Sequence, residues 1–229
     1  MAQKTALIVY AHQSSASFNA AVLDVAVQEL TEQGYRVIVS DLYAMKFRAD
    51  TTQDDIIGDL KNPELFQYGE ETMHAWMEGR LSDDIVAEQR KLEQAELVIF
   101  QFPLYWFSVP GIMKGWMDRV LTQGFAFSLE KMYNNGTFKG KKAMLSFTTG
   151  ATQSMFQPDG INGDINITLW PLQVKTQTVN VHRIRSRVAL YTSVDFRFLL
   201  LRYSGVQLTV LPWSELHCLK DGELDLKDY

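Results

Sequence analysis

The chain lacks several features that mark large classes of protein. Its 229 residues include one cysteine, Cys218, which excludes an intrachain disulfide and a zinc cluster built from cysteines. No uncharged apolar run approaches the roughly 18 to 20 residues of a membrane helix, and the apolar run near the start is too short for a signal peptide. The net charge of -5 argues against nucleic-acid binding, which needs a basic face. We therefore expect a cytoplasmic protein without a membrane or nucleic-acid partner.

Apolar runs of strand-forming residues alternate with amphipathic segments along the first three quarters of the chain. The runs predict strands at Thr5–Ala11, Tyr35–Ser40, Leu97–Gln101 and Lys142–Thr148, and the amphipathic pattern predicts helices from Ser17 to Gly34, from Ser82 to Gln94 and from Pro110 to Thr122. This alternation predicts an α/β fold with a doubly wound parallel sheet. The connection Asp41–Leu81 is too long for a plain loop, and it predicts a functional or interface-forming insertion.

An aromatic segment without charge follows the predicted strand that ends at Gln101. It contains Tyr105, Trp106 and Phe107, and no charged residue occurs between Gln101 and Lys114. In an open α/β sheet, ligands bind at the carboxyl ends of the strands, and an uncharged aromatic loop there suits a flat heterocycle. The alternative is that these rings pack on the sheet.

Two other strand ends carry polar or small residues. The first predicted strand runs into a loop with His12, Ser17 and Asn19, which suits a phosphate at a helix N-terminus although it lacks the Gly-x-Gly-x-x-Gly pattern. The last predicted strand ends in Thr148–Gly150, where small residues let a ligand approach the backbone. Ordinary helix capping and a simple turn are the respective alternatives. Together with the aromatic segment, these strand ends point to a flavin nucleotide.

Seven segments, in order, resemble the vertebrate NAD(P)H:quinone oxidoreductases, the DT-diaphorases. They are Ala6–His12, Ser17–Asn19, Ser40–Met45, Val98–Phe107, Lys114–Trp116, Thr148–Gly150 and Leu169–Leu172. The resemblance covers Lys4 to Gln173. At Tyr105, Ser108 and Met117 the chain is more similar to the dihydronicotinamide-riboside:quinone branch than to the NAD(P)H branch. It implies a flavodoxin-like fold, a homodimer, and an FAD site that both subunits complete. It also implies reduction of quinones by two electrons from a reduced nicotinamide, by ping-pong hydride transfer.

The resemblance implies a role for individual residues. Those that would hold the FAD are His12, Ser17, Phe18, Asn19, Gln67, Leu104, Tyr105, Trp106, Phe107, Thr148, Thr149, Gly150 and Ala151. Those that would face the quinone and the partner's flavin are Ala126, Phe127 and Ser128. Phe156 and Asn162 stand where the NAD(P)H branch places a Tyr and a His beside the flavin, so they are the candidate catalytic residues. Because Phe156 cannot donate a hydrogen bond, we expect attenuated activity.

Other departures from the family bear on the backbone and on metal binding. Ala151 replaces a family Gly, which matters only if its φ is positive, and Gly111 replaces an Ala, which weakens the start of a helix. Some members of the riboside-dependent branch bind zinc through two His, but here Val174 and Thr178 stand at those positions. We therefore expect no metal.

The resemblance ends at Gln173. Residues 174–229 hold 8 Lys or Arg against 6 Asp or Glu, whereas residues 1–173 hold 14 against 21. We therefore divide the chain into a flavodoxin-like FAD-binding domain, 1–173, and a divergent tail, 174–229, that is poorly ordered or docks onto the sheet. The family's last strand and helix are then missing or substituted, with Gln177–Ile184 as a crudely alternating candidate. The tail is either the product of alternative splicing or intron retention, or a new module. The alternative function is accordingly a weak or inactive isoform that dimerises with a full-length quinone reductase and modulates it.

Overall fold

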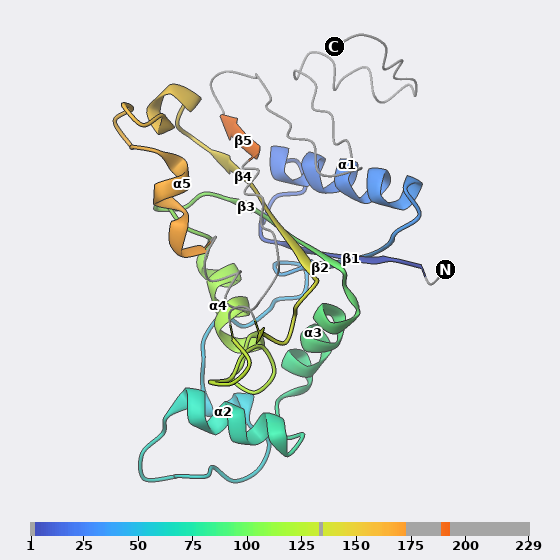
Figure 1. Ribbon diagram of the computed structural model, residues 1–229, viewed down its shortest axis with the longest axis vertical. Coiled ribbons are helices and arrows are strands. Elements are labelled where there is room, and N and C mark those ends of the chain that lie inside the picture. Colours follow the sequence, from blue (N-terminus) through green and yellow to red (C-terminus); the bar gives the residue numbers. More distant parts are fainter. Residues whose placement is uncertain (1–2, 133–134, 173–188, 193–229) are drawn as a thin grey trace.

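The computed structural model describes residues 3–132 and 135–172 together with the strand at 189–192, and a parallel sheet forms its centre. The strands are β1 (Thr5–Tyr10), β2 (Arg36–Asp41), β3 (Leu97–Pro103), β4 (Lys142–Thr149) and β5 (Ala189–Thr192). They are ordered β2-β1-β3-β4-β5, and every neighbouring pair is parallel (Figure 1). The predicted doubly wound parallel sheet is confirmed, and the four strands predicted from the sequence lie within a few residues of their expected ends.

Helices cover both faces of the sheet. Alternate residues of a strand point to opposite faces. Accordingly, Ala6 and Ile8 of β1 pack with α1 (Phe18–Glu32), whereas Leu7 and Val9 belong to the larger core on the other face. That core includes residues of α3 (Asp83–Gln94) and α4 (Gly111–Val120). Figure 1 shows α1 on one side of the strands and α3 with α4 on the other.

The predicted helix start at Ser17 is confirmed. The Ser17 hydroxyl accepts a hydrogen bond from the Ala20 N–H at 3.1 Å, which caps an N–H that the helix itself leaves without a partner. Gly34 follows the helix with a φ of 82°, a left-handed conformation that Gly adopts at little cost. These two residues set the limits of α1.

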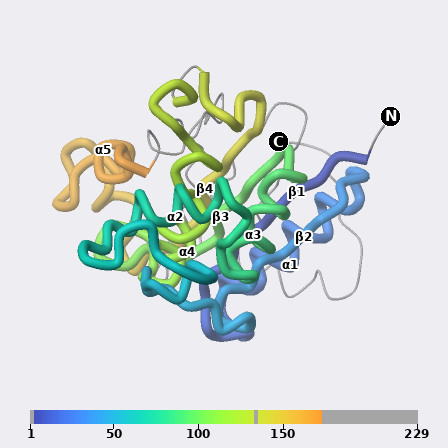
Figure 2. The backbone as a smooth tube through the Cα atoms, turned by 90° about the horizontal axis from the view of Figure 1, so that it is seen from below, coloured from blue at the N-terminus to red at the C-terminus, as the bar shows by residue number. Residues whose placement is uncertain are grey.

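The long connection between β2 and β3 contains a helix that the sequence pattern did not reveal. It folds into a short 3-10 turn, Gln53–Asp55, and into α2 (Tyr68–Met77), which packs through Ala75 against Ile85 of α3. Figure 2 shows α2 on the side of α3 and α4, away from α1. The connection is therefore an ordered part of the fold.

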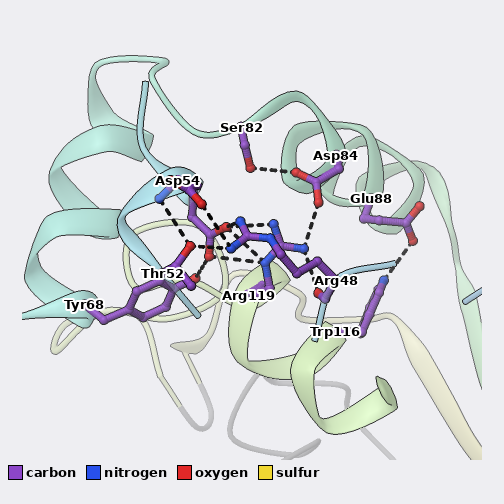
Figure 3. A network of polar contacts seen from close by, with 10 residues as sticks. Arg48, Thr52, Asp54, Tyr68, Ser82, Asp84, Glu88, Trp116 and Arg119 are labelled. Carbon is purple, nitrogen blue, oxygen red and sulfur yellow. Dashed lines mark hydrogen bonds and ion pairs between the residues drawn. The ribbon is translucent and has the colours of Figure 1, made fainter. Parts of the chain in front are cut away.

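A group of polar side chains with the buried Asp55 and Arg119 at its centre attaches this connection to α4 (Figure 3). The Asp55 carboxylate accepts hydrogen bonds from Arg48, from Arg119 of α4 at 2.7 Å and from the Tyr68 hydroxyl at 2.7 Å. Arg119 also donates to Asp84 of α3 at 2.7 Å, and both Arg119 and Asp55 are fully buried. We refer to Arg48, Asp55, Tyr68, Asp84 and Arg119 as the Asp55 network.

Beyond β4 the chain forms a short 3-10 helix, Gln153–Phe156, and one turn of helix, α5 (Ile165–Thr168). The strand β5 then continues the sheet from within residues 174–229, so of the two alternatives left open for the last strand, missing or substituted, the structure shows a substituted strand at Ala189–Thr192, a segment that the sequence did not single out. The candidate segment Gln177–Ile184 and the family's final helix lie outside the described residues. Among the helices of the described ranges, none is long and apolar enough to cross a membrane.

Candidate functional site

The aromatic segment after β3 forms a strained turn that projects into solvent. Tyr105 and Ser108 exchange two backbone hydrogen bonds of 3.0 Å, so Trp106 and Phe107 are the central residues of a two-residue hairpin. Their φ angles are 49° and 60°, in the left-handed region that costs a residue with a side chain roughly 1 to 2 kcal/mol. Trp106 is 95% exposed. A strained backbone that presents a tryptophan to solvent indicates a binding function rather than core packing.

Phe156 lies beneath this turn. Its ring meets that of Phe107 edge to face, with the centroids 6.3 Å apart, and Phe156 is only 5% exposed. Within the protomer Phe156 therefore supports Phe107 and has little surface of its own. Asn162, half-buried, donates its backbone N–H to the Met155 carbonyl at 2.9 Å, which ties its turn to the 3-10 helix of Phe156.

Asn19 and Thr148 join three strand ends into one site. The Asn19 side chain donates to the Thr148 hydroxyl at 2.9 Å and accepts from the Gln101 amide at 2.8 Å. The Thr148 carbonyl accepts the N–H of Leu104, the first residue after β3, at 2.7 Å. The predicted meeting of the β1–α1 loop, the aromatic segment and the end of β4 is thus present. The amide nitrogen and the amide oxygen of Asn19 both form hydrogen bonds within the protein, so Asn19 holds α1 to the ends of β3 and β4.

The β1–α1 loop places polar groups at the start of α1. The His12 Nδ1 accepts the Ser14 N–H at 3.0 Å, so in a neutral imidazole the proton is on Nε2, which can donate to an anion. The Ser17 hydroxyl is engaged, because it donates to the Ser14 carbonyl at 2.8 Å and caps α1. Phe18 opens the helix. Its first turn adds backbone N–H groups and the positive end of the helix dipole.

Tyr10 is a polar residue at this position that sequence reasoning missed. Its side chain is 3% exposed, and its hydroxyl has no hydrogen-bond partner among the described residues. Burial raises the pKa of Tyr10; nearby Ser17 opposes that rise, and Asp41 adds to it. Ser17 uses one lone pair for the Ala20 N–H, so its oxygen keeps a second acceptor site next to the Tyr10 hydroxyl, and this buried hydroxyl does not by itself indicate a ligand.

The end of β4 provides an open backbone. The Thr149 hydroxyl donates to the Ala151 carbonyl at 2.7 Å and holds the turn that follows. Gly150 has no atom within 4 Å of the position that a Cβ would occupy, so a ligand can approach its backbone. Ala151 is not among the described residues with a positive φ, and its replacement of a family Gly therefore introduces no strain.

The remaining predicted residues are not joined to this site by a described hydrogen bond. Gln67 precedes α2, and both Figure 1 and Figure 2 show α2 far from α1. Ala126 is fully buried in the main core and has no surface with which to touch a ligand. Phe127 is half-buried, and the Ser128 hydroxyl accepts the Lys131 N–H at 3.0 Å. None of these four is tied to Asn19 or Thr148 by a described hydrogen bond.

Tyr43 is a second residue that the sequence did not single out. Burial, and then the neighbouring Tyr105, raise the pKa of Tyr43, which places this ring near the aromatic turn. Its position after β2 in the Ser40–Met45 segment was part of the resemblance, but no chemical pattern marked it.

The assembled residues fit a flavin nucleotide. The exposed Trp106–Phe107 turn and the open Gly150 backbone suit a flat ring, and the start of α1, with His12, suits a phosphate. No group of three or more His, Cys, Asp or Glu able to hold a metal occurs in the part of the chain that the structure describes, and Cys218 lies outside it.

The fold and the site define the class. A family model for the flavodoxin-like fold matches residues 4–195, and the chain belongs to this family, which implies a flavin cofactor. The match extends past Gln173 and includes β5. The expected flavodoxin-like fold is thereby confirmed.

Within this class the most informative relatives are quinone dehydrogenases. The ribosyldihydronicotinamide dehydrogenase [quinone] of Pongo abelii is 57% identical over 173 residues, which is 76% of this chain and 75% of the relative. The NAD(P)H dehydrogenase [quinone] 1 of Rattus norvegicus is 54% identical over 76% of this chain and 63% of its own length. Both are oxidoreductases by name, and the predicted resemblance to quinone oxidoreductases of both branches is confirmed.

Solved structures show the same relationship. A Klebsiella pneumoniae protein proposed to be a quinone reductase superposes with a TM-score of 0.72 at 39% identity, over 82% of this chain and 74% of that one. The NAD(P)H:quinone oxidoreductase of Methanothermobacter marburgensis, at 24% identity and a TM-score of 0.63, shares the fold over 84% of this chain and 86% of its own.

Proposed function

We propose that this protein is an FAD-dependent quinone reductase that takes two electrons from a reduced nicotinamide, either NAD(P)H or dihydronicotinamide riboside. The observation that carries the proposal is the exposed, left-handed Trp106–Phe107 turn at the carboxyl edge of the sheet. The identity of more than half of the aligned residues to named quinone dehydrogenases supports the reaction and the substrates.

The chemistry that a flavin would supply here is two-electron redox chemistry, with the nicotinamide as hydride donor and the quinone as acceptor of a hydride equivalent and one proton. The chain's own residues would hold and orient the flavin. Trp106 and Phe107 would form an apolar shelf for the ring with Phe156 in edge contact with Phe107, and His12 Nε2 and the N–H groups of the first turn of α1 would donate hydrogen bonds to the phosphate. Donor and acceptor would use the same apolar surface in turn, so that the oxidised donor leaves before the quinone enters.

A homodimer in the cytoplasm is part of the proposal. Gln67, Phe127 and Ser128 are not joined to the site of their own protomer by a described hydrogen bond, and in a dimer they would face the partner's flavin. The exposed large apolar residues, among them Trp106 and Leu129, support burial by a second copy. The regulatory alternative gains no such support, because β5 fills the strand position whose loss motivated it.

The decisive experiment is the cofactor content and the quinone activity of the purified full chain. We expect bound flavin that is released by denaturation as FAD, and reduction of menadione with at least one of NADH, NADPH and dihydronicotinamide riboside. Trp106→Ala should lower FAD affinity tenfold or more, whereas Trp170→Ala, which also removes an exposed indole, should change it less than twofold. A chain that binds neither FAD nor FMN and reduces no quinone contradicts the proposal.

A further inference from the structure

The strand that the tail contributes is confined to one end of its neighbour. The register of β5 on β4 begins at Ser146 opposite Ala189 and ends at Thr149 opposite Thr192. The amino-terminal half of β4 is left out of this register, although it pairs with β3 on its other side. The tail strand thus supports the carboxyl end of β4, and this is the end that carries the site.

That end of β4 is where the parts of the site meet. Thr148 accepts the side chain of Asn19 with its hydroxyl and the N–H of Leu104 with its carbonyl. Thr149 holds the following turn through the Ala151 carbonyl. Any displacement of the Thr148 backbone therefore moves the start of the aromatic segment and the partner of Asn19 together.

We infer that β5 is a positioning element of the flavin site, through which the tail controls flavin affinity. The inference rests on the proposed function. An edge strand that lacks a neighbour frays at its end, so β4 without β5 would leave Thr148 and Thr149 held from one side only. Because such coupling is reciprocal, bound flavin should also strengthen the pairing of β5 with β4.

Proline substitutions in the full chain test the inference. Alternate residues of an edge strand donate their N–H groups to the neighbouring strand. Leu190 and Tyr191 are consecutive, so at least one of the variants Leu190→Pro and Tyr191→Pro removes a hydrogen bond to β4. The control is Arg36→Pro, which removes the 2.8 Å bond from the Arg36 N–H to the Lys4 carbonyl at the amino end of the opposite edge. We expect the dissociation constant of FAD, measured by quenching of flavin fluorescence, to rise tenfold or more in a β5 variant and less than twofold in the control. Folded β5 variants that both keep the wild-type constant overturn the inference.

Hydrogen exchange of the unmodified chain provides a second test that does not depend on whether the variants fold. Saturating FAD should slow amide exchange at 146–149 and at 189–192 at least fivefold more than in β2, whose amides report the general stabilisation of the fold by the ligand, and equal slowing in both strands overturns the inference. Unchanged exchange at 189–192 with FAD bound overturns the inference and leaves the proposed function standing. A full chain that binds neither FAD nor FMN overturns both.

Discussion

The fully buried Asp55 carboxylate accepts hydrogen bonds from two arginines and a tyrosine, and one of these arginines, Arg119, is itself fully buried. Replacement of one partner in such a group leaves buried charge without compensation, at a cost of about 3 to 5 kcal/mol. We therefore expect Asp55→Asn to lower the free energy of unfolding in urea by that amount. The neighbouring Asp54 is 87% exposed and lies 3.9 Å from Arg48, so Asp54→Asn should cost less than about 0.5 kcal/mol. Equal effects of the two substitutions would show that the buried network contributes no more than a surface pair.

Asp84 gives the same network a dependence on pH. Burial alone would raise the pKa of Asp84, but the hydrogen bonds from Arg119 and Ser82 outweigh it and hold the pKa below its usual value. A carboxyl with a lowered pKa in the folded state stabilises the fold at pH values above its unfolded pKa, and this stabilisation is lost as the pH falls through the folded value. The wild type should thus exceed Asp84→Asn in unfolding free energy at pH 7, and the difference should shrink below about pH 4. A difference that is constant down to pH 3 would contradict this assignment.

The left-handed turn at Trp106 can be tested separately from its binding role. Gly adopts a positive φ without the steric penalty that Ala retains. The free energy of unfolding of Trp106→Gly should therefore be about 1 kcal/mol higher than that of Trp106→Ala. Both variants remove the indole and should bind FAD equally weakly. Urea unfolding of the two flavin-free variants measures the strain, and a Gly variant less stable than the Ala variant would argue that the turn relaxes in solution.

The sequence allowed site residues to be predicted only where a local sequence pattern indicates their role. The aromatic turn and the cap at Ser17 follow from local patterns and were found. Tyr10 and Tyr43 were not, because a tyrosine at a strand end has no distinctive spacing, and what marks both is the burial that raises the pKa of each hydroxyl. Phe156 was predicted as a candidate catalytic residue beside the flavin, and its edge-to-face contact with Phe107 is an arrangement that no sequence pattern encodes.

At the scale of the element, two glycines of α4 have opposite requirements. Gly111 has open space where a Cβ would stand, whereas a Cβ on Gly115 would collide with the backbone of Ala49. Gly111→Ala should therefore stabilise the protein by about 0.4 to 1 kcal/mol, because the unfolded chain loses freedom and the helix gains propensity. Gly115→Ala should destabilise it by roughly 1 to 3 kcal/mol, because the long connection must move away from α4. Thermal unfolding of both variants checks this, and effects of the same sign would contradict the close approach of residue 49.

Elements with a strong local pattern were predicted and those held by distant contacts were not. The continuous apolar runs of β1 and β3 are typical of strands buried on both faces, and they were located from sequence within a few residues. The helix α2 has a polar, weakly periodic sequence, and its position depends on Ala75 packing and on the distant Asp55–Arg119 pair. The strand β5 has only four residues and gains its conformation from β4, so the tail sequence gave no indication of it.

At the scale of the whole molecule, flavin binding and folding should be linked. A ligand at 100 times its dissociation constant, bound to the folded state alone, adds about 2.7 kcal/mol of stability. For a chain of this length that corresponds to a rise in the melting temperature of roughly 5 to 10 °C. We expect FAD to produce this rise and ADP, which lacks the isoalloxazine, to produce much less. A melting temperature that ignores FAD would show that the folded chain has no site for it.

The bond between Asn19 and Thr148 spans 129 residues, and this separation has a consequence during synthesis on the ribosome. At about 5 to 20 residues per second, Thr148 is made roughly 6 to 26 s after Asn19. During the first part of that interval β1, α1 and β2 emerge before β3 has been made, so the apolar residues of β1 are not yet covered. The strand ends that form the site come together only when β4 follows. The nascent chain is consequently exposed to chaperones and to aggregation until nearly two thirds of it has been translated, and the cofactor can bind only after that point.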